Sequence, residues 1–131
     1  MRNFTLTMAV LAAWSAFAQQ EPIQSTINLQ FEAFQADDFV TAFGFASPNI
    51  QGIFGTAETF GLMVKNGYPM VYRAADVQML DLRDVAGLLY QRVLVRDADG
   101  RGYVLDYQMV ETDDGWKING VDLVRQPDVS A

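Results

Sequence analysis

Apolar residues between Glu21 and Asp37 recur at the spacing expected for one face of a helix. Successive members are separated by four, four and three positions: Ile23, Ile27, Phe31 and Phe34. This repeat predicts an amphipathic helix that turns one side towards a core. The positions between them are polar and are expected on the other sides of the helix: Gln24, Asn28, Gln30 and Gln35.

Capping residues predict three shorter helices in the next part of the chain. Asp37 or Asp38 can cap a short helix that carries Phe39, Val40 and Phe43. Ser47 followed by Pro48 is a second start signal, and that helix is expected to stop near Gly55. Thr56 can cap a third helix that runs to about Asn66, where Gly67 ends it.

After Gly67 the apolar positions alternate, which predicts strands. Five segments show this pattern: Met70–Arg73, Val77–Arg83, Leu88–Arg96, Tyr103–Glu111 and Trp116–Val124. Short runs rich in aspartate and glycine separate the last four, and loops of that length make antiparallel hairpins. Helices followed by an antiparallel sheet predict an α+β fold, with the helices gathered on one face of the sheet.

The loop Asp97–Gly100 suggests a register for the central hairpin. If this loop is symmetric, Leu94 lies opposite Tyr103, Arg92 opposite Leu105, and Tyr90 opposite Tyr107. These residues are then expected on the face that meets the helices. In the next hairpin we expect Met109 opposite Ile118.

The opposite face of the predicted sheet is half apolar. It is expected to carry six aliphatic residues: Val93, Val95, Val104, Val110, Val121 and Leu123. They flank a polar lane of Gln91, Asp106, Gln108 and Asn119. A face of this kind is typical of a sheet that meets a partner, so we expect a homodimer formed through the sheet.

The first 18 residues resemble a secretory signal peptide. Arg2 precedes an apolar run from Phe4 to Trp14, and the small-x-small sequence Ala16-Phe17-Ala18 follows. A membrane anchor is disfavoured because spanning a bilayer takes about 20 apolar residues, and this apolar run is roughly half as long. A buried N-terminal helix would leave the small-residue site unexplained. We therefore expect cleavage after Ala18, a periplasmic or secreted location with no membrane anchor after processing, one domain over residues 19–124, and a flexible tail over 125–131.

Composition excludes several classes of function. The chain has 16 acidic and 9 basic residues, so removal of Arg2 with the leader changes the net charge from −7 to −8. Such a charge disfavours nucleic-acid binding. The chain contains no cysteine and no histidine. It therefore lacks disulfides, thiol chemistry and every catalytic arrangement that needs an imidazole.

Five residues are candidates for ligand binding: Tyr72, Arg73, Tyr90, Arg92 and Tyr107. In the expected register Arg92 lies among aromatic residues, where its guanidinium could bind a carboxylate or a polar head group. The alternative is that Arg92 lies at the rim of the sheet and pairs with Glu111 or Asp76. Tyr68, Tyr72 and Arg73 lie at the Gly67–Pro69 turn and could form the lip of a pocket, although a rigid turn explains the Gly67-Tyr68-Pro69 triplet equally well.

No catalytic residue, metal ligand or cofactor site is predicted. Asp97 and Asp99 suggest a calcium site, but their loop lacks the length and the glutamate of an EF-hand. A role of these aspartates in the hairpin turn is therefore favoured. Gly52 and Gly55 lack the lysine of a phosphate-binding loop. An enzyme would have to use a tyrosine with a buried carboxylate, as isomerases and cyclases do.

Four short runs carry a resemblance to a bacterial family, the domain of unknown function 4864. They are QADDF (35–39), FASP (45–48), GYP (67–69) and GWKING (115–120). The resemblance covers about residues 27–123 and implies a nuclear-transport-factor-2-like cone, in which a curved antiparallel sheet wraps the helices. Such cones are often dimeric and often have a pocket at the open end, and this family has no established catalytic residues. The sequence thus predicts an exported domain that binds a small apolar or amphipathic ligand, or a protein partner, without catalysis.

Overall fold

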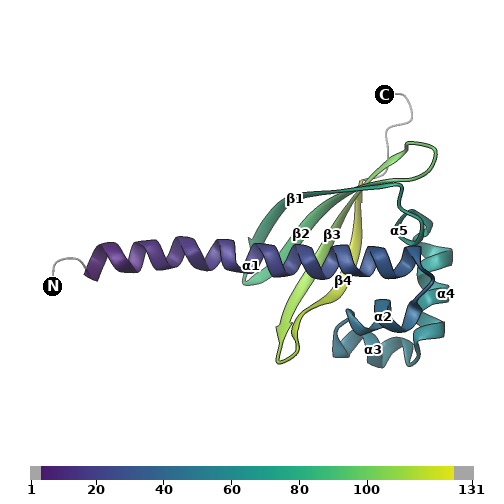
Figure 1. Cartoon of the computed structure of the whole chain (residues 1–131), viewed down its shortest axis with the longest axis horizontal. Coiled ribbons are helices and arrows are strands. Elements are labelled where there is room, and N and C mark those ends of the chain that lie inside the picture. The colour runs from purple at the N-terminus through teal and green to yellow at the C-terminus, as the bar shows by residue number, and fades with distance from the viewer. Residues whose placement is uncertain (1–3, 126–131) are drawn as a thin grey trace.

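The computed structural model describes the backbone of residues 4–125 and the side chains of residues 18–124. It has the predicted α+β order, five helices followed by four strands (Figure 1). The helices are α1 (Phe4–Gln35), α2 (Phe39–Gly44), α3 (Pro48–Phe54), α4 (Ala57–Gly67) and α5 (Pro69–Tyr72). The strands are β1 (Asp76–Val85), β2 (Leu88–Arg96), β3 (Gly102–Thr112) and β4 (Gly115–Arg125).

A curved antiparallel sheet covers the C-terminal half of α1, and the shorter helices gather at the end of that helix (Figure 1). The predicted apolar face of α1 forms the centre of the core, where Ile23, Ile27 and Phe34 are almost fully buried. The helix begins earlier than predicted and runs through Pro22 and Ala18. Residues 1–3 and 126–131, which include the start of the predicted leader and most of the predicted tail, lie outside the described residues. No helix in the described part of the chain is long and apolar enough to cross a membrane.

Gly67 was predicted to cap the end of the third short helix, but it is the last residue of α4 and Tyr68 is the C-cap. The predicted N-terminal caps are confirmed. Asp38, Ser47 and Thr56 each accept a hydrogen bond from the backbone amide three residues ahead, at the starts of α2, α3 and α4. The predicted strand at Met70–Arg73 is wrong, because this segment forms the short helix α5 with Pro69 in its first turn. Burial of Val71 against the core outweighs the preference of its neighbours for strands.

The register of the central hairpin differs from the prediction by one residue. Val95 lies opposite Tyr103 and Val93 opposite Leu105, because the loop includes Arg101. Gly100 has a φ of +84° and its amide donates to the Asp97 carbonyl, which is the geometry of a turn with one extra residue. A shift of one residue turns every side chain of β2 over. Val93, Val95 and Gln91 therefore face the helices, whereas Tyr90, Arg92 and Leu94 lie on the outer face.

The following hairpin has the predicted pairing of Met109 with Ile118. Beyond it, β4 contains a bulge at Asn119, after which Gly120 pairs with Gln108 and Val121 with Tyr107. The bulge brings Val121 to the helix-facing side, contrary to the predicted outer position. This change of face helps to build the cavity described next.

Candidate functional site

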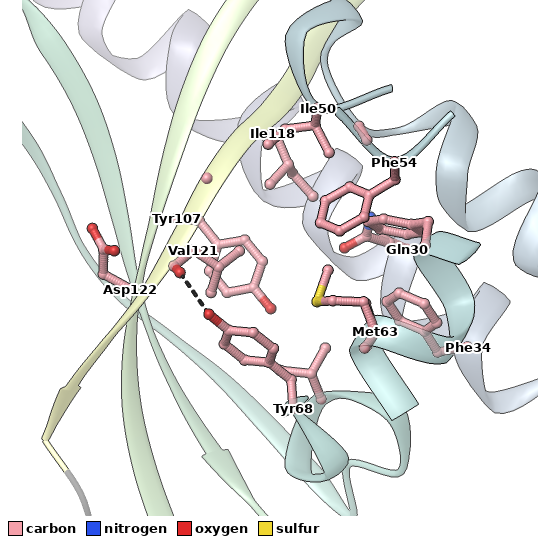
Figure 2. Close-up of a pocket in the computed structure, with 15 residues that line it drawn as sticks. Gln30, Phe34, Ile50, Phe54, Met63, Tyr68, Tyr107, Ile118, Val121 and Asp122 are labelled. Atoms are coloured by element: carbon pink, nitrogen blue, oxygen red, sulfur yellow. Dashed lines mark hydrogen bonds between the residues drawn. The ribbon is translucent and has the colours of Figure 1, made fainter. Parts of the chain in front are cut away.

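A cavity of about 300 Å³ lies between the inner face of the sheet and the helices (Figure 2). Its apolar lining comes from α1, α3, α4, α5, β4 and the segment before α3. These residues are Phe34, Ala46, Ile50, Phe54, Phe60, Met63, Val64, Val71, Ile118 and Val121. Gln30, Tyr68, Tyr107, Gly120 and Asp122 complete it. A partly open apolar hollow with a few polar groups has the character of a small-molecule site.

Helical spacing explains the wall formed by the helices. In α4, Phe60, Met63 and Val64 lie at positions i, i+3 and i+4 and share one face. In α1, Gln30 and Phe34 are likewise four residues apart, so both reach the same side. Phe34 packs against Phe60, with ring centroids 6.1 Å apart.

The bulge at Asn119 ties the sheet wall to α3. The Ser47 hydroxyl donates to Asn119 Oδ1 at 2.7 Å, and Asn119 Nδ2 donates to Gln108 Oε1 at 2.6 Å. The Ser47 amide also donates to the Ile118 carbonyl at 2.8 Å. These bonds fix the start of α3 beside β4 and leave Val121 directed towards the cavity.

The Tyr107 hydroxyl has no hydrogen-bond partner among the described residues, although Tyr107 is only 1% exposed. It points into the cavity (Figure 2). By contrast, the Tyr68 hydroxyl donates to the Val121 carbonyl at 3.2 Å, and Gln30 Nε2 donates to the Ala42 carbonyl at 3.0 Å. A buried hydroxyl without a partner loses the bonds it had in water, so it marks the place where a ligand could bond.

The described side chains that point into the cavity carry no charge. Burial raises the pKa of Tyr107 far above its ordinary value, so this hydroxyl keeps its proton and is a neutral donor. Among the described residues, no lysine or arginine lines the cavity, and the only carboxylate is that of Asp122. The Asp122 side chain points away from the cavity, on the other side of β4 (Figure 2).

Of the five predicted ligand-binding residues, the structure places only Tyr107 in this cavity. Tyr72 and Arg73 lie on the surface at the end of α1, where both bind the Asp37 carboxylate. The Arg73 guanidinium also covers the Tyr72 ring, 4.0 Å from its centroid. These bonds lower the pKa of Asp37, chiefly through the Tyr72 hydroxyl and then through Arg73. The arrangement joins α5 to α1 and leaves neither side chain directed at the cavity.

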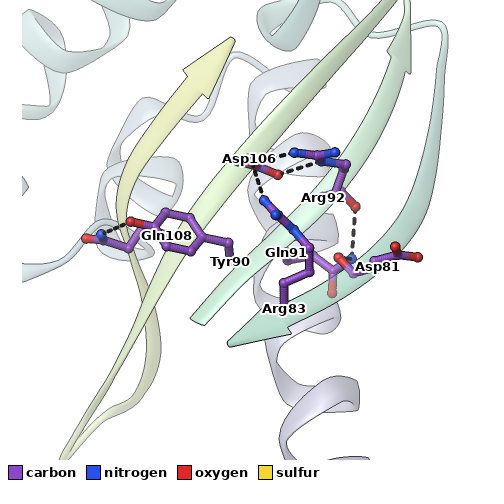
Figure 3. Close-up of polar contacts among 7 residues, drawn as sticks. All are labelled: Asp81, Arg83, Tyr90, Gln91, Arg92, Asp106 and Gln108. Carbon is purple, nitrogen blue, oxygen red and sulfur yellow. Dashed lines mark hydrogen bonds and ion pairs between the residues drawn. The ribbon is translucent and has the colours of Figure 1, made fainter. Parts of the chain in front are cut away.

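Tyr90 and Arg92 lie on the outer face of the sheet (Figure 3). Arg92 pairs with Asp106, not with the predicted Glu111 or Asp76, and Asp106 also binds Arg83. The Tyr90 hydroxyl accepts a hydrogen bond from Gln108 Nε2 at 2.9 Å. The one-residue change of register explains both positions. Arg92 therefore has a carboxylate partner within the fold and does not face the aromatic interior.

One polar residue of the lining, Gln30, was missing from the residues predicted for a pocket. Gln30 was expected on a polar side of α1, yet it is buried. Its spacing of seven from Ile23 and four from Phe34 places it on the core face, and that periodicity was the available signal. Of the three residues expected at the lip of a pocket, the structure places Tyr68 in the lining, but not Tyr72 or Arg73.

The aspartates of the central loop serve the turn. Asp97 Oδ1 accepts the backbone amides of Asp99 and Arg101, each at 3.0 Å. This is the side-chain-to-backbone bonding that favours aspartate in turns. Among the described residues, no cluster of three or more acidic side chains could hold a metal ion.

Comparison with known proteins identifies one family. A family model described as Domain of unknown function (DUF4864) matches residues 16–131. No curated protein and no solved structure gives a significant match to the chain.

Proposed function

The chain belongs to the DUF4864 family, and we propose that it is an exported domain that binds a small apolar or amphipathic ligand in the cavity, without catalysis. The observation that carries this proposal is an apolar cavity of about 300 Å³ into which the Tyr107 hydroxyl points, with no hydrogen-bond partner in the described part of the chain. Protein interiors are otherwise close-packed, so the apolar side chains that line a hollow of this size gain contacts when a ligand fills it.

The composition of the lining favours binding over chemistry. An isomerase or cyclase without histidine needs a carboxylate within hydrogen-bond reach of a tyrosine inside the cavity. Asp122 points away from Tyr107 (Figure 2), and Asp106 lies on the outer face of the sheet. A tyrosine alone can orient a ligand, but it offers no base for proton abstraction.

We further propose that the fold is a nuclear-transport-factor-2-like cone. The curved sheet around α1, with the short helices at one end, supports this assignment (Figure 1). The position of the cavity, between the inner face of the sheet and α4, also agrees with the cones that carry pockets.

Export is proposed from the leader, with cleavage after Ala18 and a periplasmic or secreted product. The mass of the protein recovered from cells that express all 131 residues tests this directly. The expected mass is that of a chain beginning at Gln19. Recovery of the intact chain in the cytoplasm would contradict export.

Native mass spectrometry of the protein purified from its own host, without detergent, tests ligand binding. We expect an additional small-molecule mass that is released on denaturation. Val121→Phe, which fills the cavity, should lose this mass, whereas Val104→Phe on the outer face of the sheet should retain it. Absence of any bound mass, together with no thermal shift in a ligand screen, would reject the small-molecule proposal in favour of a protein-interaction domain.

We also propose that two copies associate through the outer face of the sheet. Leu94, Val104 and Val110 lie there and are half-buried, so the face between the polar side chains is apolar. Sedimentation velocity at micromolar concentration should show a dimer. A single monomeric species would contradict this proposal without affecting the one for the cavity.

A further inference from the structure

We infer that the ligand is an uncharged molecule of about 10–15 non-hydrogen atoms that presents one oxygen acceptor to the Tyr107 hydroxyl. This inference rests on the proposed function, because it names the chemical class of the ligand for that same cavity. Its three parts, the hydrogen-bond acceptor, the lack of charge and the size, follow from different observations.

The acceptor follows from the state of the polar groups in the lining. The hydroxyl hydrogen of Tyr68 and one amide hydrogen of Gln30 are already used by backbone carbonyls. Tyr107 alone has a buried hydroxyl that bonds to nothing in the described structure. A carbonyl, ester or hydroxyl oxygen on the ligand would accept its proton and remove the cost of an unpaired donor.

The lack of charge follows from the electrostatics of the lining. Among the described residues, no lysine or arginine reaches the cavity to pair with a carboxylate or phosphate. The chain as a whole carries a net charge of −7. An anionic group beside the buried Tyr107 hydroxyl would therefore lack a partner inside an acidic protein, at a cost far larger than one hydrogen bond to Tyr107 would return. A fatty-acid anion is disfavoured for this reason.

The size follows from the volume. A cavity of about 150 Å³ accommodates benzene, with six carbon atoms, so the cavity of about 300 Å³ accommodates about twice as many non-hydrogen atoms. The aromatic rings of Phe34, Phe54 and Phe60 offer flat surfaces on which a planar ligand can stack.

A series of three naphthalenes of equal size tests the inference, each with about 13 non-hydrogen atoms, within the range set by the volume. 2-Acetylnaphthalene carries a neutral acceptor, 2-isopropenylnaphthalene replaces that oxygen by carbon, and 2-naphthoate carries an anion. Fluorescence titrations use protein purified after expression of the full chain and freed of any bound ligand. We expect the ketone to bind about tenfold more tightly than the alkene, and at least tenfold more tightly than the naphthoate.

Tyr107→Phe identifies the donor. This variant should bind the ketone and the alkene with equal affinity, because the hydroxyl has been removed while the ring is retained. The matched control is Tyr103→Phe in the same strand, whose hydroxyl lies by Asp97 at 3.4 Å, outside the cavity lining, and which should keep the tenfold preference.

Several outcomes would overturn the inference. Equal binding of ketone and alkene by the unmodified protein, a preference that survives Tyr107→Phe, or tightest binding of the naphthoate would each contradict it. Failure of all three probes would show that the size is wrong. In that case, a bound mass in the native spectrum would still support the proposed function, so the two can fail separately.

Discussion

Arg92 and Asp106 lie directly opposite each other on β2 and β3 and are joined by two hydrogen bonds, Nε to Oδ1 at 3.0 Å and Nη2 to Oδ2 at 2.9 Å (Figure 3). Arg83 on β1 adds a third bond to Oδ2 at 2.7 Å. The Asp106 side chain is only 11% exposed. One carboxylate therefore joins three adjacent strands on the outer face, and this pairing is possible only in the observed register.

Asp106→Asn is expected to lower the free energy of unfolding by about 1–3 kcal/mol at pH 7, because the two arginines lose a charged acceptor. Chemical denaturation measures this change. The control is Asp122→Asn, since Asp122 lies opposite Asp106 on β4 but is exposed. The control should change stability by less than about 0.5 kcal/mol. Equal effects of the two substitutions would contradict the structural role of Asp106.

The same carboxylate predicts a loss of stability in acid. The hydrogen bonds from Arg92, and then the nearby charges, lower the pKa of Asp106 in the folded state. A lowered pKa means that its stabilising contribution is complete above the unfolded pKa of about 3.9 and is lost as the pH falls through the folded value. Unfolding measured between about pH 5 and pH 2 should therefore show a shallower acid-induced loss for Asp106→Asn than for the unmodified protein. The remaining slope is expected because Asp37 and Asp38 also have lowered pKa values.

The register of β2 shows how far the sequence could predict this fold. Capping residues and periodicity predicted α2 to α4 and the order of the strands, because these depend on local chemistry. Which side chains of β2 face the helices depends on whether Arg101 belongs to the loop. Both registers place apolar or aromatic residues on the inner face, because Tyr90, Val93, Leu94 and Val95 are all of this kind. Packing of the core decides between them by burying Val93 and Val95.

The cavity was harder to predict than the fold. Tyr107 could be assigned to the inner face by alternation alone. Val121 could not, because its position depends on a bulge fixed by contact between Asn119 and Ser47, which are 72 residues apart. That the Tyr107 hydroxyl has no partner among residues 18–124 is likewise a property of the packed structure and leaves no pattern in the sequence.

Gln91 supports a bulge in β1, and its replacement should be costly. Its side chain is fully buried, and Nε2 donates to the carbonyls of Leu80 and Arg92, each at 2.9 Å. The bulge between Met79 and Leu82 leaves the Leu80 carbonyl without its ladder partner. Gln91→Leu keeps the volume but removes these donors, so we expect a loss of about 2–3 kcal/mol in chemical denaturation. Gln78→Leu, at an exposed site of β1, is the control and should be nearly neutral. A neutral Gln91→Leu would contradict this role.

Replacement of glycine by alanine is expected to have opposite effects on stability at Gly61 and at Gly52. Alanine normally stabilises a helix interior by about 1 kcal/mol relative to glycine. A Cβ at Gly61 of α4 would lie 2.6 Å from the ring of Phe39, which is held between Phe34 and Tyr72. Gly61→Ala should therefore destabilise the protein by about 1–3 kcal/mol. Gly52→Ala in α3 meets open space and should stabilise it by up to about 1 kcal/mol. Thermal unfolding of both variants tests the close approach of α4 to α2, and stabilisation by Gly61→Ala would contradict it.

Removal of the Tyr107 hydroxyl should have effects of opposite sign in the empty and the occupied cavity. In the ligand-free protein the hydroxyl is buried and has no partner among the side chains and backbone that the structure describes. Tyr107→Phe should therefore leave the free energy of unfolding unchanged or raise it by up to about 1 kcal/mol. Tyr68→Phe should instead lower it by about 1 kcal/mol, because the Val121 carbonyl loses its donor. With bound 2-acetylnaphthalene, the thermal shift of Tyr107→Phe should be smaller than that of the unmodified protein, since the ligand oxygen then has no donor. Differential scanning calorimetry with and without the ketone measures both effects. A destabilised ligand-free Tyr107→Phe would mean that its hydroxyl already has a partner, and the cavity would then lack the donor on which ligand recognition depends.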